Sequence, residues 1–191
     1  MASSTVKSSG KLQSYLKDIT GNLANGSAVK VGFLEGSTYE DGTPIATVAA
    51  VMEFGAVIDM PAREQNIYFR QNKDGSIGNR FVKREKSNFA QNVQVPAHRV
   101  VIPARPFFRD AIEKNASGWA GAVQTALKDN DYNASKAMSL VGQGIVDQVS
   151  ESIGEFNSVP LKPSTIKKKG FDKQLIETGD MQRAVDYEVI K

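Results

Sequence analysis

The stretch from Val100 to Asp110 limits the possible folds most strongly, because it joins an extended segment to a helix through two prolines. Val100 and Ile102 share one face of the extended segment, since side chains alternate between faces along a strand. Prolines have no N–H to donate to a ladder, so strand pairing should end at Pro103. Pro106 has the fixed φ that suits the first turn of a helix. We therefore predict a strand, a sharp corner and a helix starting near Pro106.

Two aromatic rings and two arginines occupy this corner. Phe107 and Phe108 open the predicted helix, between Arg105 and Arg109. Two interpretations remain open. In the first, the corner is structural and its two rings fill the core. In the second, the arginines also face a partner subunit. The residues expected to form the structural corner are Pro103, Pro106, Phe107 and Phe108.

The composition argues against most catalytic chemistry. The chain has 191 residues, no cysteine and a single histidine, His98, so disulfides and thiolate metal sites are excluded. A lone histidine in an alternating strand is more often structural than catalytic, because a general base needs a positioned partner. Glu35, Glu40 and Asp41 cluster in a loop, where carboxylates are usually solvated. Neither a nucleophile elbow, a Walker loop nor a dinucleotide fingerprint is present. We expect no enzyme activity, no cofactor and no metal.

Membrane insertion and secretion are not expected either. The chain has no apolar run of 18 residues, so we expect no membrane-spanning helix. The first residues lack the charged start and apolar core of a secretory signal. The simplest expectation is a protein that works where it is made.

Positive charge is concentrated in the middle of the chain. The net charge is +3, but residues 63–105 hold nine Lys or Arg and three acidic residues, or +6, so the rest sums to −3. Such asymmetry indicates nucleic acid or an acidic protein face as a partner. A solvated basic loop is the simpler alternative.

Hydrophobic spacing predicts an α+β fold. A period near 3.6 residues predicts helices at 11–24, 44–54, 106–128 and 133–154, and alternation predicts strands at 28–34 and 185–189. We expect a small mixed or antiparallel sheet packed by the N-terminal helix, the short helix and a long αα-hairpin made by the last two helices. Residues 1–10 should form a loose tail, and 11–191 a single domain.

Caps and glycines refine these helices. Thr43 is the expected N-cap of the second helix, with Pro44 at its first position and Gly55 as its left-handed C-cap. Glycine is unfavourable inside a helix, so glycines there indicate close approach of a neighbouring element. The glycines concerned are Gly118, Gly121, Gly142 and Gly144.

Residues 60–98 differ from the rest, with few aliphatic side chains and many charges. Two short β-type pieces, 67–70 and 80–83, flank the turn cluster 72–79, which predicts a hairpin. This segment cannot supply a core of its own. We predict an inserted, projecting, β-rich basic arm that buries its aromatic rings on something else. The candidate subunit or partner interface comprises Glu53, Tyr68, Phe69, Phe81, Lys83, Arg84, Lys86, Phe89, Arg105 and Arg109.

Four motifs, in order, resemble a known family. They are VAAVMEFG at 48–55, IPARPFFR at 102–109, LKPSTI at 161–166 and LIETGDM at 175–181. Together they resemble the neck and tail-completion proteins of long-tailed bacteriophages, which overlap the minor tail and virion-morphogenesis families. The similarity covers about residues 28–190. The predicted arm is longer than in the smallest members of that family.

The resemblance implies a structural virion protein without enzyme activity. Its α+β body would assemble in the host cytoplasm into a homo-oligomeric ring, such as a hexamer or dodecamer, in the neck of the virion. Expected partners are the connector or adaptor on one side and the tail tube or tail terminator on the other. DNA passing through the channel could touch the basic arm non-specifically. The alternative is a non-specific nucleic-acid-binding protein using residues 63–105, since phosphate contacts need only positive charge.

Overall fold

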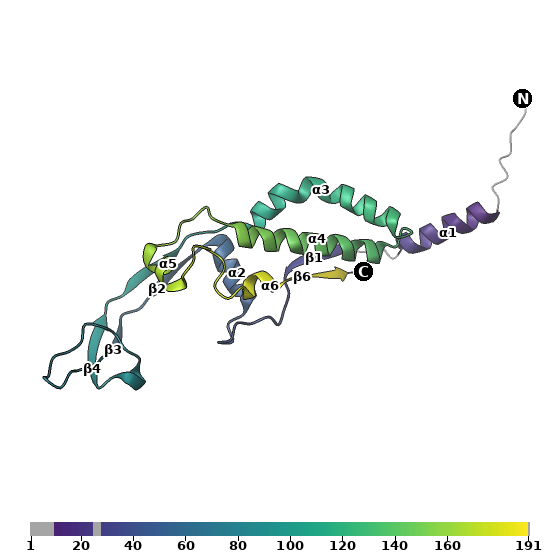
Figure 1. Ribbon diagram of the computed structural model, residues 1–191. Helices are drawn as coiled ribbons and strands as arrows, with labels where there is room; N and C mark the ends of the chain where they lie inside the picture. Colours follow the sequence, from purple (N-terminus) through teal and green to yellow (C-terminus); the bar gives the residue numbers. More distant parts are fainter. Residues whose placement is uncertain (1–9, 25–27, 191) are drawn as a thin grey trace, which may run out of the picture. The chain divides into compact units, whose positions relative to one another are not determined.

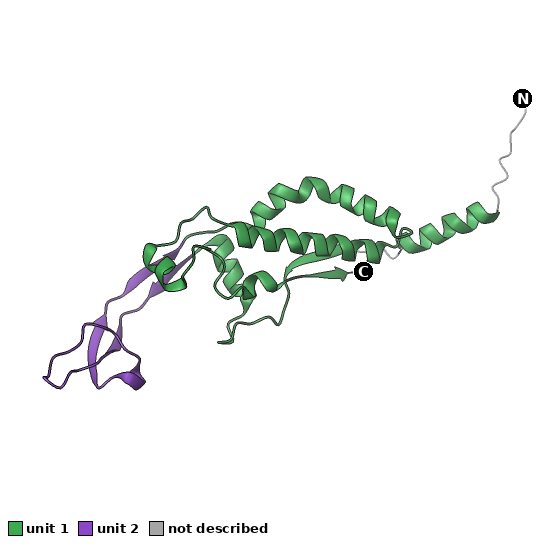
Figure 2. Ribbon diagram, in the orientation of Figure 1, with its two compact units in different colours: residues 1–55, 103–191 green, residues 56–102 purple. Residues whose placement is uncertain are grey.

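The computed structural model describes residues 10–24 and 28–190, and it confirms the α+β class (Figure 1). The chain divides into two compact units, unit 1 (1–55 and 103–191) and unit 2 (56–102), shown in Figure 2. Unit 2 starts before and ends after the predicted arm, 60–98. The predicted loose tail at 1–10 lies outside the described residues except for Gly10, which begins the first helix.

Unit 1 combines helices with a two-stranded antiparallel sheet. Its described helices are α1 (Gly10–Ala24), α2 (Ile45–Phe54), α3 (Phe107–Asp129), α4 (Ala134–Glu155), α5 (Pro163–Lys169) and α6 (Asp180–Arg183). Strand β1 (Ala28–Phe33) pairs with β6 (Val185–Ile190), in a register that runs from Ala28 opposite Ile190 to Phe33 opposite Val185. The predicted strands near both ends of the chain therefore pair with each other.

The core of unit 1 forms around α4, which packs against α3 and against both strands of the sheet (Figure 1). Val149 and Ile153 on α4 are each 1% exposed, and they share a cluster with Ile45 of α2 and Phe107 of α3. The α3–α4 pair is the predicted αα-hairpin. The side chain of Asn133 accepts a hydrogen bond from the Lys136 amide, which caps the start of α4.

The N-terminal helix differs from the prediction that it packs on the sheet. Four apolar side chains of α1 are exposed rather than buried, namely Leu12, Tyr15, Leu16 and Leu23. The spacing correctly predicts an amphipathic helix, but amphipathicity does not determine what covers the apolar face.

The ends of α2 also differ in detail. Pro44 is the N-cap and the helix begins at Ile45, whereas the Thr43 amide donates to the Asp41 carboxylate over 3.0 Å. Gly55 has the predicted positive φ, 74°, but its ψ is 169° rather than that of a left-handed helical cap. The extended ψ follows from the chain, because the next strand begins directly at Ala56.

Unit 2 consists of two antiparallel ribbons. Strand β2 (Ala56–Met60) pairs with β5 (His98–Ile102), and β3 (Arg63–Phe69) pairs with β4 (Phe89–Val95). The ladder is interrupted in both strands between these ribbons, by Pro61 and Pro96. As predicted, β5 ends directly before Pro103.

The predicted pairing of 67–70 with 80–83 is wrong. Residues 80–83 form no strand, although the Val82 amide donates to the Tyr68 carbonyl over 2.9 Å. The β3–β4 register instead pairs seven residues, which supplies more ladder hydrogen bonds than a four-residue hairpin. The turn cluster 72–79 does turn the chain, with hydrogen bonds from Asn72 N to Ser76 O and from Gly78 N to Arg70 O.

Only one of the four helical glycines meets the predicted close neighbour. A Cβ atom added to Gly142 would lie 2.7 Å from both Tyr187 Cδ2 and Val29 Cγ2, on the two strands of the sheet. The prediction of close approach is wrong for the other three, where a Cβ would meet nothing within 4 Å: Gly118, Gly121 and Gly144.

Alanine substitutions at two glycines of α4 should therefore have opposite effects. Gly142→Ala should lower the free energy of unfolding by about 1–3 kcal/mol, because the added methyl group overpacks the helix–sheet contact. Gly144→Ala, two positions along, should raise it by about 0.5–1 kcal/mol through helix propensity. Urea denaturation of both variants measures the difference. Equal effects of the two substitutions would contradict the packing described for α4.

Candidate partner interface

Unit 2 has no interior. None of residues 56–102 is buried, whereas the buried apolar core residues of the described chain all belong to unit 1. Two-stranded ribbons are at best marginally stable in water unless something packs on them. Unit 2 therefore lacks a hydrophobic core of its own.

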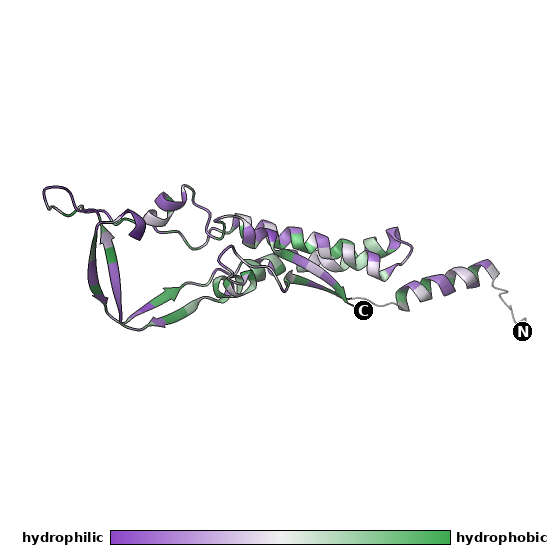
Figure 3. Ribbon diagram, turned by 90° about the horizontal axis from the view of Figure 1, so that it is seen from below, coloured by the Kyte–Doolittle hydropathy of each residue, from purple (hydrophilic) through white to green (hydrophobic). Residues whose placement is uncertain are grey.

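The β2–β5 ribbon exposes aliphatic side chains on both faces. Val57 lies opposite Val101, and Ile58 lies opposite Val100. Because side chains alternate, the first pair occupies one face and the second pair the other. Val57 is 61% exposed and Val101 65% exposed, and Figure 3 colours much of both strands as hydrophobic. Such apolar surface is typical of contact sites.

Sequence reasoning did not predict β2 as part of this surface. The run AVIDM directly follows α2 and is short. The sequence nevertheless indicates this strand. Residues 57–58 are two adjacent β-branched residues, a type enriched in strands, and the valines at 100–101 form a second such pair.

The other ribbon ends in an aromatic cluster. Phe69 and Phe89 face each other across the β3–β4 ladder, and the Phe81 ring lies 5.4 Å from that of Phe69. Phe81 is 73% exposed, whereas Tyr68, Phe69 and Phe89 are half-buried. The structure thus brings together three of the four aromatic rings predicted for the interface, and only one of them is largely in solvent.

The loop between β3 and β4 also carries exposed basic residues. Lys83, Arg84 and Lys86 are exposed, and a short 3-10 helix spans Arg84–Lys86. Within residues 10–24 and 28–190, none of these three side chains forms a hydrogen bond or ion pair. Their charges are available to a partner.

Glu53 does not lie at an exposed boundary. It is only 5% exposed, and its carboxylate accepts hydrogen bonds from the Phe108 amide (2.9 Å), the Arg109 amide (3.3 Å) and Arg109 Nε (2.8 Å). Arg109 Nη2 also donates to the Glu53 carbonyl over 2.9 Å. The end of α2 thereby caps the start of α3, where backbone amides lack helical partners and a negative charge is favoured. The Glu53–Arg109 ion pair is thus formed within one subunit.

The arginine and phenylalanine side chains of the corner differ in how deeply they are buried. Phe107 is 1% exposed and meets Phe33 edge-on at 6.1 Å, whereas Phe108 is half-buried.

Burial lowers the pKa of Arg105, whose Nη1 lies 3.4 Å from Met52 Sδ. Arg109 lies 5.3 Å above the exposed Phe54 ring. Phe54 and Arg109 are therefore the residues that this corner presents outward.

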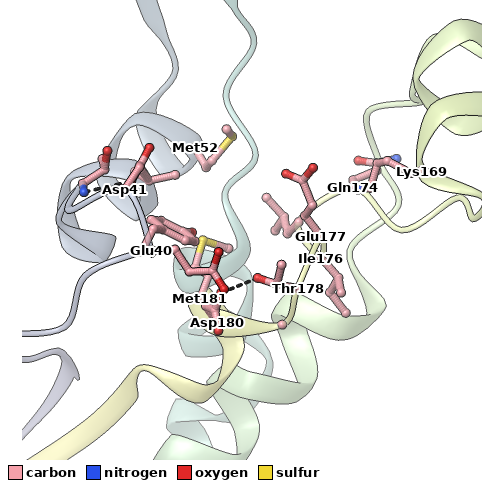
Figure 4. Close-up of a pocket in the computed structure, with 15 residues that line it drawn as sticks. Glu40, Asp41, Met52, Lys169, Gln174, Ile176, Glu177, Thr178, Asp180 and Met181 are labelled. Atoms are coloured by element: carbon pink, nitrogen blue, oxygen red, sulfur yellow. Dashed lines mark hydrogen bonds between the residues drawn. The ribbon is translucent and has the colours of Figure 1, made fainter. Parts of the chain in front are cut away.

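A pocket of about 450 Å³ opens in unit 1 between the loop before α2 and the segment before α6 (Figure 4). Its apolar lining includes Val48, Met52, Leu175, Ile176 and Met181. Four carboxylates also line it: Glu40, Asp41, Glu177 and Asp180. Sequence reasoning treated the first two as solvated loop residues and did not connect them with the segment at 175–181.

The pocket is anionic at neutral pH. Hydrogen bonds from Thr178 and from Arg183 hold the pKa of Asp180 below its usual value, and those from Thr43 lower the pKa of Asp41. Burial, followed by the charges of Asp180, Glu177 and Asp41, raises the pKa of Tyr39, which therefore stays neutral.

The one lysine that lines the pocket already has partners. Lys169 Nζ donates to the Lys173 carbonyl over 2.6 Å and lies 5.0 Å from the centre of the Phe171 ring. Of the four carboxylates, Asp180 is paired with Arg183 at 2.6 Å, so Glu40, Asp41 and Glu177 face one engaged ammonium group. No cluster of three or more carboxylates or histidines in the described residues is placed to hold a metal ion. The arrangement therefore suits a cationic partner group.

Two further observations bear on partners. None of the described helices combines the length and apolar character needed to cross a membrane. Comparisons with family models, with curated proteins and with solved structures find nothing that matches this chain.

Proposed function

We propose that this chain is a structural virion protein of a tailed bacteriophage, forming a homo-oligomeric ring at the head–tail junction that joins the connector to the tail. The observation that carries the proposal is that none of residues 56–102 is buried. A segment with exposed valines on both faces of one ribbon and a basic aromatic end on the other is suited to assembly. The ordered motifs at 48–55, 102–109, 161–166 and 175–181 supply the family hypothesis.

A ring needs two different faces on each subunit, because repeated head-to-tail contacts close into a cycle. Unit 2 and unit 1 differ in net charge, so they can provide two different faces. Unit 2 carries eight Lys or Arg against four acidic residues, or +4, which leaves −1 for the rest of the chain. Connector and tail proteins would bind the outer surfaces of such a ring. DNA passing through it would meet basic side chains without being read for sequence.

Reconstitution tests the proposal. The purified chain is mixed with the connector ring and the tail-tube protein of the same phage, then examined by mass measurement and negative-stain imaging. We expect a closed ring that joins the connector to the tail protein. A persistent monomer that binds neither protein would contradict the proposal.

A non-specific nucleic-acid-binding role is the second candidate, and the exposed, unpaired Lys83, Arg84 and Lys86 favour it. A salt titration of DNA binding separates the two roles. A dedicated binder should retain useful affinity at physiological salt and lose it steeply as salt rises. A neck protein should bind DNA weakly and non-specifically, or not at all.

Removing most of unit 2 should separate assembly from folding. With residues 64–96 replaced by two glycines, unit 1 should keep its helical content and its urea midpoint, because the buried apolar residues of the described chain lie elsewhere. Ring formation should be lost. Circular dichroism and mass measurement test both expectations. An insoluble or unfolded deletion protein would show that unit 2 belongs to the folding core.

A further inference from the structure

The loop between β3 and β4, here called the tip (residues 70–88), has an exposed aromatic ring inside a field of positive charge. It contains six Lys or Arg and two acidic residues, or +4. Phe81 is 73% exposed, and Ile77 in the same loop is 48% exposed. Such a surface is complementary in charge and polarity to an apolar pocket that is lined at its edge by acidic residues.

The pocket of unit 1 has these properties. Its volume of about 450 Å³ exceeds the roughly 150 Å³ cavity that accepts a benzene molecule, so it has enough volume for a phenylalanine ring. Met52 and Met181 line it, and thioether sulfurs make favourable contacts with aromatic rings. In Figure 4, these methionines lie among labelled carboxylates that come from both sides of the opening.

The rim charges are free to pair. Glu40 and Glu177 line the pocket and are exposed, and neither side chain makes a hydrogen bond or ion pair with the described part of the chain. The tip offers Lys83 and Arg84, which are equally unpaired. Phosphate groups would be repelled by this pocket, so nucleic acid is not its occupant.

We propose that the tip of one copy of this chain docks into the pocket of unit 1 in a second copy, with Phe81 entering the apolar lining and Lys83 and Arg84 meeting Glu40 and Glu177. The contact joins two different surfaces, and its repetition builds a head-to-tail assembly that is a ring when the rotation between copies closes. The inference rests on the proposed homo-oligomer and names the surfaces that build it.

Engineered cysteines provide a direct test, because the natural chain has none. Lys83→Cys and Glu177→Cys are placed in separate copies that carry tags of different mass, and the mixture is oxidised. We expect a disulfide between the two kinds of copy. Lys83→Cys mixed with Lys114→Cys, a cysteine on the exposed face of α3, serves as the matched control. Cross-linking no greater than in the control would overturn the proposal.

Complementation provides the second test. Phe81→Asp should weaken self-association roughly tenfold or more, as expected for loss of an aromatic anchor. The double variant Glu40→Lys, Glu177→Lys should weaken it similarly. Each variant keeps one intact surface, so a mixture should form dimers of unlike copies and no rings. Rings formed by either variant alone, or a mixture that stays monomeric, would overturn the proposal.

Failure of this contact and failure of the proposed function are distinguishable. If Phe81→Asp protein still forms a ring between the connector and the tail protein, the virion role stands and the contact is wrong. If the cysteines cross-link but the chain binds neither of those proteins, the contact stands and the virion role is wrong.

Discussion

Glu53→Ala should lower the free energy of unfolding by about 2–4 kcal/mol. The substitution removes a 5% exposed carboxylate that accepts hydrogen bonds from Phe108 N, Arg109 N and Arg109 Nε. Hydrogen bonds to charged groups contribute about 1.5–3 kcal/mol, and loss of a helix cap costs about 1 kcal/mol. The side chain of Arg109 is 57% exposed, so water replaces part of the hydrogen bonding that it loses.

Two matched variants sharpen this prediction. Glu53→Gln keeps the shape and one acceptor oxygen, so it should lose about half as much stability. Glu113→Ala removes an exposed carboxylate from α3 and should change stability by no more than about 0.5 kcal/mol. Urea denaturation compares the three. If Glu53→Ala resembles Glu113→Ala, the α2–α3 cap contributes nothing to stability.

Phe107→Ala should lower the free energy of unfolding by about 3–5 kcal/mol, the usual loss for a fully buried phenylalanine. Phe107 is 1% exposed, and its ring meets Phe33 at 6.1 Å and Phe108 at 6.4 Å. The substitution leaves a cavity where α3 meets α4 and β1.

The chain offers graded controls for Phe107. The half-buried neighbour Phe108→Ala should lose less stability, and Phe81→Ala, at a ring that is 73% exposed, should change it by no more than about 0.5 kcal/mol. Thermal and urea denaturation should rank the three variants in that order. A larger loss at Phe108 would mean that the two rings exchange roles in solution.

The corner shows what the sequence predicts well. Proline chemistry places the end of β5 at Ile102 and the start of α3 at Phe107, within one residue of expectation. Which of the two adjacent phenylalanines is buried depends on the direction from which α4 approaches, and local pattern does not contain this information. The Glu53 cap joins residues 55 and 56 positions apart, so it is likewise invisible to local reasoning.

Unit 2 and the pocket show where sequence reasoning fails. Short β-type runs allow several registers, and the seven-residue pairing of β3 with β4 replaces the expected hairpin. The pocket joins Glu40 and Asp41 to residues near Asp180, far along the chain, and no periodicity signals such a meeting. Similarly, the helical spacing of apolar residues in α1 predicts a helix but not that its apolar face is exposed.

Locating the chain in intact virions tests the central claim most directly. A copy carrying a C-terminal label is incorporated into phage particles, and the label is imaged by electron microscopy. The proposal predicts label density as a ring at the junction of head and tail. Label that is absent from the particles, or found only elsewhere on them, would contradict it.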